Sequence, residues 1–163
     1  EFDQRMNNLI DESDGLPSIA VELGFDEYDL VIIASLIEEE AKLDEDRAKI
    51  SRVIWNRLQQ EWLLGIDATA CYFPEIPCSE LRQSHLDDPN PWNTRAIAGL
   101  PFTPISAPGQ ASLEAAFFPE EGPWMYYVLT DEGGVDGAHR FVETDSEFQE
   151  AKAECARLKL GCS

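Results

Sequence analysis

The segment that most limits how this chain can fold is an apolar stretch, residues 30–41, with three consecutive glutamates near its end. Its apolar side chains recur at helical spacing and form one face, made of Leu30, Ile33, Ile37 and Ala41. On such a helix Glu39 points away from this face and Glu38 lies at its edge. Glu40 falls within the face, one turn after Ile37. The pattern therefore predicts a buried helix that carries one carboxylate toward the protein interior.

The position of Glu40 has a chemical consequence. Burial removes water from a carboxylate and raises its pKa. A carboxyl that keeps its proton near neutral pH can act as a general acid. The alternative is a solvated charge run at a helix end. Spacing alone favours that alternative, because most glutamates on helices lie at the surface.

Length and composition indicate a globular domain. The chain has 163 residues, of which 44% are hydrophobic and 27% charged, enough for one domain with a core. A formal net charge of -20 argues against nucleic acid or anionic membrane surfaces as main partners. No apolar run approaches the roughly 20 residues that a membrane span needs. The first residues do not resemble a signal peptide, and because residue 1 is not Met we expect a part of a longer chain.

Four cysteines form two close pairs, Cys71 with Cys78 and Cys155 with Cys162. Neither spacing is that of a zinc site, and the chain has only two histidines, so no metal or other cofactor is expected. We predict two local disulfides in an extracytoplasmic domain, with four reduced thiols as the alternative.

Hydrophobic periodicity and turn residues predict an α+β chain. The expected elements are a core helix from the cap Asp26 to about residue 42, helices over 47–62, 109–118 and 144–160, and a hairpin of strands over 124–130 and 139–142. The second helix has Arg57 at a position of its apolar face. Residues 66–73 fit either a strand or a mixed strand–helix passage, and the sequence does not decide between them.

The domain organisation follows from these elements. Residues 1–25 are predicted to be a polar lead-in or linker remnant, and residues 26–163 to be a single domain. That domain has a helical body carrying Glu40, a long Pro-rich loop over 74–108 and a small antiparallel sheet. Irregular loops of this length are usually functional.

Five groups of residues match one family in order along the chain. They are Ala34–Glu40, Val53–Leu58, Asp67–Thr69, Asn93–Gly109, and the hairpin segments Tyr126–Val128 with His139–Phe141. They resemble the Glu-x-Glu helix, the Asn-Arg-Leu helix, the Asp-Pro-Thr element, the Asn-Thr…Pro-Gly loop and the closing hairpin of the YceG-like family. This family comprises the MltG-type endolytic murein transglycosylases. The resemblance covers their catalytic domain, which is expected to be lysozyme-like in that a helical body carries the catalytic glutamate.

The resemblance implies a reaction and a catalytic residue. The second glutamate of the family's signature, here Glu40, is expected to cleave the MurNAc–GlcNAc bond of peptidoglycan without water, first as acid and then as base. The product would carry a 1,6-anhydro-MurNAc end. This is the same residue that the helical spacing selects.

The resemblance also suggests substrate contacts. Candidates that would bind or orient the glycan are Asp67, Thr69, Asn93, Thr94, Tyr126 and His139, with Trp92 as a further ring for stacking and Glu38 as a supporting carboxylate. Each has a plainer alternative: a turn-forming aspartate, polar groups that cap their own loop, core aromatics and a histidine that binds backbone.

Several family features differ in this chain. The residues that replace the family's usual ones are Glu39 for Lys, Gly65 for Gln, Ala68 for Pro, Arg95 for Tyr and Phe148 for His. These differences keep two other functions open. One is a lysozyme-like hydrolase with Asp67 as the second carboxylate, and the other is a non-catalytic peptidoglycan-binding or cell-wall-synthesis scaffold.

The resemblance implies partners and a location as well. The expected ligand is the glycan strand of peptidoglycan, with proteins of cell-wall synthesis as further partners. We expect the full-length protein to be membrane-anchored at the outer face of the cytoplasmic membrane. The anchor and the family's LysM-like part are absent from this sequence.

Overall fold

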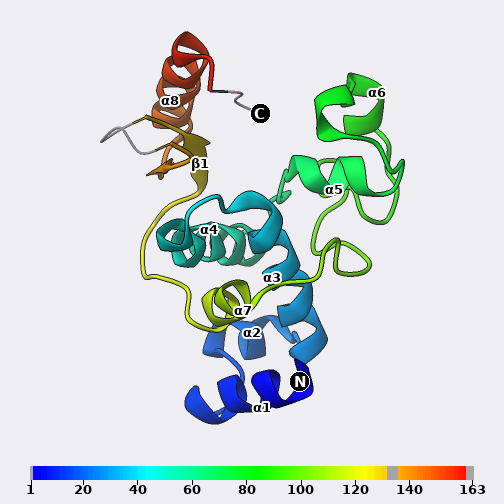
Figure 1. Ribbon diagram of the computed structural model, residues 1–163, viewed down its shortest axis with the longest axis vertical. Helices are drawn as coiled ribbons and strands as arrows, with labels where there is room; N and C mark the ends of the chain where they lie inside the picture. The colour runs from blue at the N-terminus through cyan, green and yellow to red at the C-terminus, as the bar shows by residue number, and fades with distance from the viewer. Residues whose placement is uncertain (1, 132–135, 161–163) are drawn as a thin grey trace.

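The computed structural model describes residues 2–131 and 136–160 and has a helical body with one small sheet (Figure 1). The elements are α1 (Phe2–Glu12), α2 (Ser18–Leu23), α3 (Glu27–Glu40), η1 (Asp44–Asp46), α4 (Arg47–Gln59), α5 (Asp67–Tyr72), η2 (Cys78–Glu80), α6 (Gln83–Leu86), α7 (Gln110–Phe117), β1 (Tyr126–Leu129), β2 (His139–Val142) and α8 (Asp145–Leu158). The predicted α+β class is confirmed. None of the described helices is long and apolar enough to cross a membrane.

Helix α3 lies at the centre of the core, packed against α4 and α7. The predicted cap is present, because the Asp26 carboxylate accepts the backbone N–H groups of Tyr28 and Asp29 at 2.8 and 3.2 Å. Trp55 of α4 is fully buried, and its indole N–H donates to the Ala116 carbonyl oxygen at 3.2 Å. Burial of the apolar face of α3 therefore fixes the direction in which its carboxyl end points.

The first 25 residues are not the polar lead-in that the sequence suggested. They form α1 and α2, which lie against the base of the helical body in Figure 1, and Met6, Leu9, Ile19 and Ala20 are buried in its core. The apolar positions of α1 are few and separated by polar residues, which hid a short amphipathic face. This segment is therefore part of the core.

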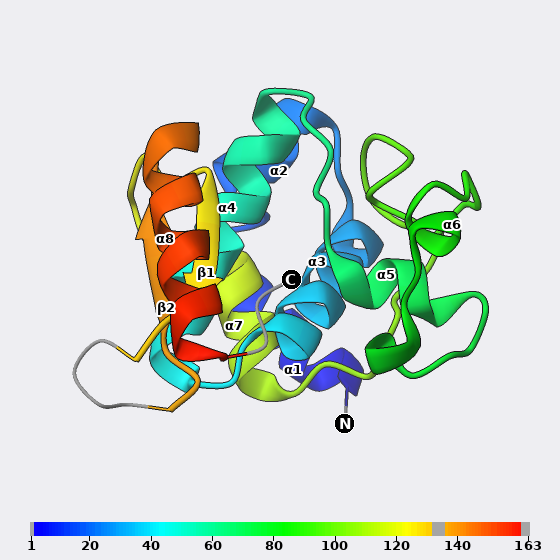
Figure 2. The ribbon, with the colours of Figure 1, turned by 90° about the horizontal axis from the view of Figure 1, so that it is seen from above.

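The hairpin predicted near the C-terminus is confirmed. Strands β1 and β2 pair antiparallel, with Tyr127 opposite Phe141 and Leu129 opposite His139. Helix α8 lies across this hairpin (Figure 2), and Val128, Ala151 and Cys155 form a second, smaller core. The helix predicted over 144–160 begins at the N-cap Thr144, whose hydroxyl oxygen accepts the backbone N–H of Glu147. The hairpin and α8 therefore form one packed unit beside α4.

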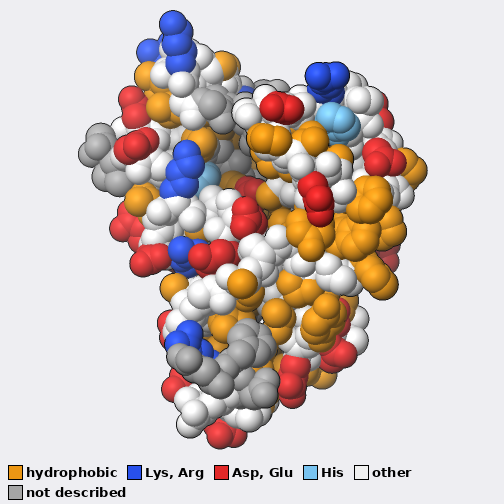
Figure 3. Space-filling view, turned by 45° about the vertical axis from the view of Figure 1, so that its right-hand side comes forward, with side chains coloured by type: hydrophobic (Ala, Val, Ile, Leu, Met, Phe, Trp, Pro, Cys, Tyr) orange, Lys and Arg blue, Asp and Glu red, His pale blue; other side chains and the backbone are white. Residues whose placement is uncertain are grey.

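The Pro-rich segment after α5 holds two short helices, η2 and α6, and otherwise irregular backbone. Residues 66–73, which the sequence left undecided, contain the short helix α5. The predicted disulfide Cys71–Cys78 is present and joins α5 to η2. The second predicted disulfide, Cys155–Cys162, involves a cysteine outside the described residues. The body of the protein thus carries two raised units, the hairpin with α8 and the loop with α5 and α6, with a hollow between them (Figure 3).

Loss of the Cys71–Cys78 disulfide is expected to destabilise the fold. The cysteines are 7 positions apart, and closing so short a loop stabilises a protein by about 2 kcal/mol in the chain-entropy account. The double variant Cys71→Ser/Cys78→Ser should lose about that free energy of unfolding in urea titrations. The control is Ser79→Ala, an exposed change in the same loop. An unchanged unfolding midpoint for the double variant would contradict this assignment.

Candidate active site

Glu40 is the last residue of α3. It borders a cavity of about 210 Å³. The other residues that line this cavity are Arg57, Leu64, Gly65, Asp67, Arg95, Tyr126, Tyr127, Phe148 and Lys152. Glu40 also borders a smaller cavity of about 100 Å³, lined in addition by Glu39, Lys42, Tyr127, Val128, Leu129 and His139. The helix end therefore places one carboxyl between two small spaces.

The environment of Glu40 favours its protonated form. Burial raises the pKa of Glu40 above its ordinary value of 4.5, and the charge of Asp67 adds to this. A hydrogen bond from the Tyr127 hydroxyl to Glu40 Oε2, at 2.8 Å, offsets part of the effect. Burial and the Glu40 charge raise the pKa of Tyr127 well above its ordinary value, so its hydroxyl remains a donor. Glu40 is thus suited to hold a proton and then release it.

The other two glutamates differ from Glu40 as the helical spacing predicted. Glu39 is exposed. Glu38 accepts the Ser112 hydroxyl at 2.6 Å, the Gly109 N–H at 3.2 Å and the Arg47 guanidinium at 3.3 Å. The Ser112 hydrogen bond lowers the pKa of Glu38 most. Glu38 therefore anchors the start of α7 to α3, a supporting role.

The raised pKa of Glu40 implies that the stability of the folded protein depends on pH. Between 4.5, the value expected in the unfolded chain, and the higher folded pKa, the folded protein binds more protons than the unfolded one. The free energy of unfolding should therefore fall as pH rises through that window. Glu40→Gln removes this pH-dependent loss of free energy of unfolding, because glutamine does not ionise. Its amide oxygen can still accept the hydrogen bond of the Tyr127 hydroxyl.

We expect Glu40→Gln to melt above the wild type at pH 7, with the difference disappearing below pH 4.5, in thermal scans across pH. Glu39→Gln, a change of the exposed neighbour, serves as the control and should show no such gain. A variant less stable than the wild type at pH 7 would contradict the buried, proton-holding carboxyl.

His139 contacts Tyr127, the residue that donates a hydrogen bond to Glu40. Its backbone N–H and its ring Nδ1 both lie 2.9 Å from Asp46 Oδ2. Its ring stands edge-on to Tyr127, with the ring centroids 5.5 Å apart. Asp46 directly precedes α4 but makes no cap hydrogen bond with its side chain, and it holds His139 instead. Asp46, His139 and Tyr127 therefore form a supporting chain that ends at Glu40.

Asn56 and Arg57 of α4 attach the hairpin to the body. The Asn56 amide donates to the carbonyl oxygens of Gly122 and Trp124 at 3.0 and 2.8 Å. Arg57 donates to the carbonyl oxygens of Met125 and Leu64. Its guanidinium also lies 5.2 Å from the Tyr126 ring centroid. Neither residue was nominated from the sequence, although an arginine on an apolar helix face was the available signal.

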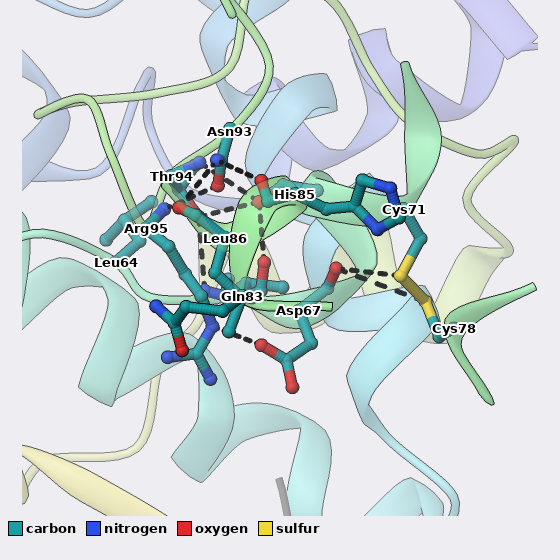
Figure 4. A network of polar contacts seen from close by, with 12 residues as sticks. Leu64, Asp67, Cys71, Cys78, Gln83, His85, Leu86, Asn93, Thr94 and Arg95 are labelled. Carbon is teal, nitrogen blue, oxygen red and sulfur yellow. Dashed lines mark hydrogen bonds and ion pairs between the residues drawn. A yellow bond between two sulfur atoms is a disulfide. The ribbon is translucent and has the colours of Figure 1, made fainter. Parts of the chain in front are cut away.

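Asp67 borders the larger cavity with Glu40, as expected, but it is ion-paired. Its carboxylate accepts Arg95 Nε, and both residues line the cavity (Figure 4). Arg95 occupies the position at which the family usually has tyrosine. The structure thus gives Asp67 a partner that the sequence did not foresee.

Three expected substrate contacts are interior residues instead. Thr69, Asn93 and Thr94 are fully buried. The Asn93 amide donates to the carbonyl oxygens of His85, Leu86 and Asp88 at 3.0, 3.0 and 2.7 Å (Figure 4). The hydroxyls of Thr69 and Thr94 lie 2.9 Å apart, and Thr94 also accepts the Ile66 N–H. Because these polar groups have partners inside the protein, they hold the loop in place, which was the plainer alternative.

Tyr126 lies at the cavity, while Trp92 lies elsewhere. The Tyr126 ring stacks on Phe148 with centroids 4.5 Å apart and meets Trp62 edge-on at 6.0 Å. Trp92 belongs to a separate aromatic cluster near α5. No group of His, Cys, Asp or Glu able to hold a metal ion occurs among the described residues.

Comparison with known proteins identifies relatives of this chain. The model of the YceG-like family matches residues 1–154. The chain is 34% identical over 125 residues to an endolytic murein transglycosylase of Bacillus subtilis (strain 168), covering 77% of this chain and 34% of that protein. The crystal structure of a yceG-like protein from Listeria monocytogenes superposes with a TM-score of 0.69 at 30% identity, covering 81% of this chain and 41% of the other. The chain thus spans well under half the length of either relative.

Proposed function

The chain belongs to the YceG-like family, and from that premise we propose that it is the catalytic part of an endolytic lytic transglycosylase acting on peptidoglycan. The observation that carries the proposal is the Glu40 carboxyl. It is partly buried and borders two small cavities, its pKa is raised, and it is hydrogen-bonded to Tyr127. The relative from Bacillus subtilis, named an endolytic murein transglycosylase, supports it.

The proposed reaction needs one carboxyl that acts twice. Protonated Glu40 donates its proton to the oxygen that leaves the anomeric carbon of MurNAc. The resulting carboxylate then accepts the proton of the muramic C6 hydroxyl, whose oxygen attacks the same carbon and closes the 1,6-anhydro ring. Glu40 ends protonated, and no water is consumed. The Tyr127 hydroxyl stabilises the intermediate carboxylate.

The environment of Asp67 favours this reaction over hydrolysis. A hydrolase would need a second carboxylate as nucleophile or as base for water. Asp67 is the candidate that the sequence suggested for this role, but its carboxylate forms an ion pair with Arg95. A guanidinium stabilises the negative charge and so weakens the carboxylate as a nucleophile or base. We therefore assign the Asp67–Arg95 pair to the shaping of the cavity beside Glu40.

The proposal extends to location and partners. The chain would act outside the cytoplasm on glycan strands of the cell wall. In the full-length protein a membrane anchor would hold it at the outer face of the cytoplasmic membrane, near proteins of cell-wall synthesis.

Digestion of purified peptidoglycan in water enriched in ¹⁸O tests the proposed chemistry. A transglycosylase leaves no ¹⁸O at the new chain ends, because the C6 hydroxyl takes the place of water. Lysozyme digestion run in parallel provides the labelled control. One ¹⁸O per cleavage by this chain would establish a hydrolase, and absence of cleavage would support the scaffold alternative.

A further inference from the structure

A cluster of aromatic side chains, three of them exposed and one partly buried, lies on the α5 side of the molecule. It consists of Tyr72, Phe73, Trp92 and Phe102. Phe73 stacks on Trp92 with centroids 5.2 Å apart and planes 5° apart, and Phe102 meets Trp92 edge-on at 5.9 Å. Yet Tyr72, Phe73 and Phe102 are 40%, 54% and 70% exposed. Contiguous apolar surface of this kind marks a binding site more often than isolated exposed residues do.

Tyr72, Phe73 and Trp92 of this cluster line a groove of about 600 Å³, and Phe102 packs against Trp92 beside it. Its walls combine ring and aliphatic side chains with two carboxylates, those of Glu39 and Glu75. Figure 3 shows hydrophobic side chains gathered on this flank, beside acidic ones. The volume lies in the range of about 300–1,000 Å³ usual for small-molecule sites. Ring faces with nearby acceptors suit a pyranose, which has an apolar C–H face and a rim of hydroxyl donors.

The groove is continuous with the candidate active site. Glu39 borders both the groove and the smaller cavity at Glu40. Within α5, Asp67 lines the larger catalytic cavity and the next residue, Ala68, lines the groove. A glycan strand that is bound at Glu40 would therefore pass close to the groove.

Covalent and polar contacts hold the groove in shape. The Cys71–Cys78 disulfide forms part of its wall next to Tyr72 and Phe73. The Trp92 indole N–H donates to the Thr103 hydroxyl oxygen at 2.9 Å. On the opposite wall, the N–H of Ile105 donates to the buried Ser35 hydroxyl of α3 at 3.1 Å. A site fixed in advance loses less entropy when it binds a ligand.

We propose that this groove is a glycan subsite, which binds sugars of the same strand at a distance from the bond cleaved at Glu40. The inference rests on the proposed function, because an enzyme that cuts inside a strand must hold sugars beyond the reacting pair. The exposed ring of Phe73 in the groove and that of Phe102 next to it would stack on pyranose faces, while Glu39 and Glu75 would accept hydrogen bonds from the sugar hydroxyl groups.

The test compares long peptide-free glycan strands with a tetrasaccharide as substrates of wild type and Phe73→Ala/Phe102→Ala. We expect the KM for long strands to rise about tenfold with kcat unchanged, and tetrasaccharide cleavage to stay within about twofold. Phe118→Ala, which removes a phenylalanine 46% exposed on another face, is the matched control. If the double variant does not fold, Phe102→Ala alone is measured by the same criteria.

Binding measurements separate failure of the subsite from failure of the proposed function. If the wild type cleaves long strands and the double variant has the same KM, the subsite is overturned while the function stands. If the wild type does not cleave, the subsite is tested by equilibrium binding of long strands. The binding constant of Glu40→Gln is then compared with that of the same variant carrying the two phenylalanine changes. Binding weakened about tenfold supports the subsite, whereas equal binding or none overturns it.

Discussion

Replacement of Glu40 by glutamine should lower the rate of glycan cleavage about a thousandfold. The amide keeps the size of the side chain and can still accept the Tyr127 hydroxyl, but it can neither give a proton to the leaving oxygen nor take one from the C6 hydroxyl. Initial rates of release of soluble fragments from purified peptidoglycan measure the effect.

The neighbouring glutamate provides the control for this prediction. Glu39→Gln makes the same chemical change one residue away, at an exposed position of the same helix. Because Glu39 also lines the proposed glycan subsite, the comparison uses kcat, which should stay within about twofold of the wild type while KM carries any loss of binding. Equal rates for Glu40→Gln and wild type would remove Glu40 from the reaction, and a loss in Glu39→Gln alone would transfer the role to that residue.

Replacement of Arg57 by alanine should lower the free energy of unfolding by about 3 kcal/mol, the largest stability effect that we expect at the site. The change leaves the carbonyl groups of Leu64 and Met125 without their donors and removes the cation beside Tyr126. Because these contacts attach the hairpin that carries Tyr127, kcat should also fall about tenfold. Urea unfolding and cleavage rates measure the two effects.

Arg52 of the same helix is the matched control for Arg57. It also donates to backbone carbonyl groups, those of Glu120 and Pro119, but does not line the cavities at Glu40. Arg52→Ala should cost about 1 kcal/mol of stability and leave kcat unchanged. If both variants lose the same stability and neither changes kcat, Arg57 does not support the site.

The sequence predicted the parts of the structure that depend on local periodicity. The apolar face of α3 singled out Glu40 among three adjacent glutamates, although spacing alone still favoured a solvated charge run at the helix end. The caps Asp26 and Thr144 and the hairpin also follow from neighbouring residues. Residues 1–25 were misjudged because α1 presents only a short apolar face among polar residues, and its burial depends on distant helices.

The details of the site depended on contacts between distant segments. Strand alternation places Tyr126 and Tyr127 on opposite faces of β1, but only the packing of the hairpin against α3 shows that Tyr127 meets Glu40. Asp46 and His139 pair across 93 positions of the chain. Motif positions likewise placed Asn93 and Thr94 near the site without showing that their polar groups turn inward.

The measurement that tests the central claim most directly is mass spectrometry of the strand ends that this chain releases from purified peptidoglycan, with Glu40→Gln in parallel. We predict 1,6-anhydro-MurNAc ends from the wild type and none from the variant. Reducing MurNAc ends from the wild type, or anhydro ends from Glu40→Gln at the wild-type rate, would contradict the account.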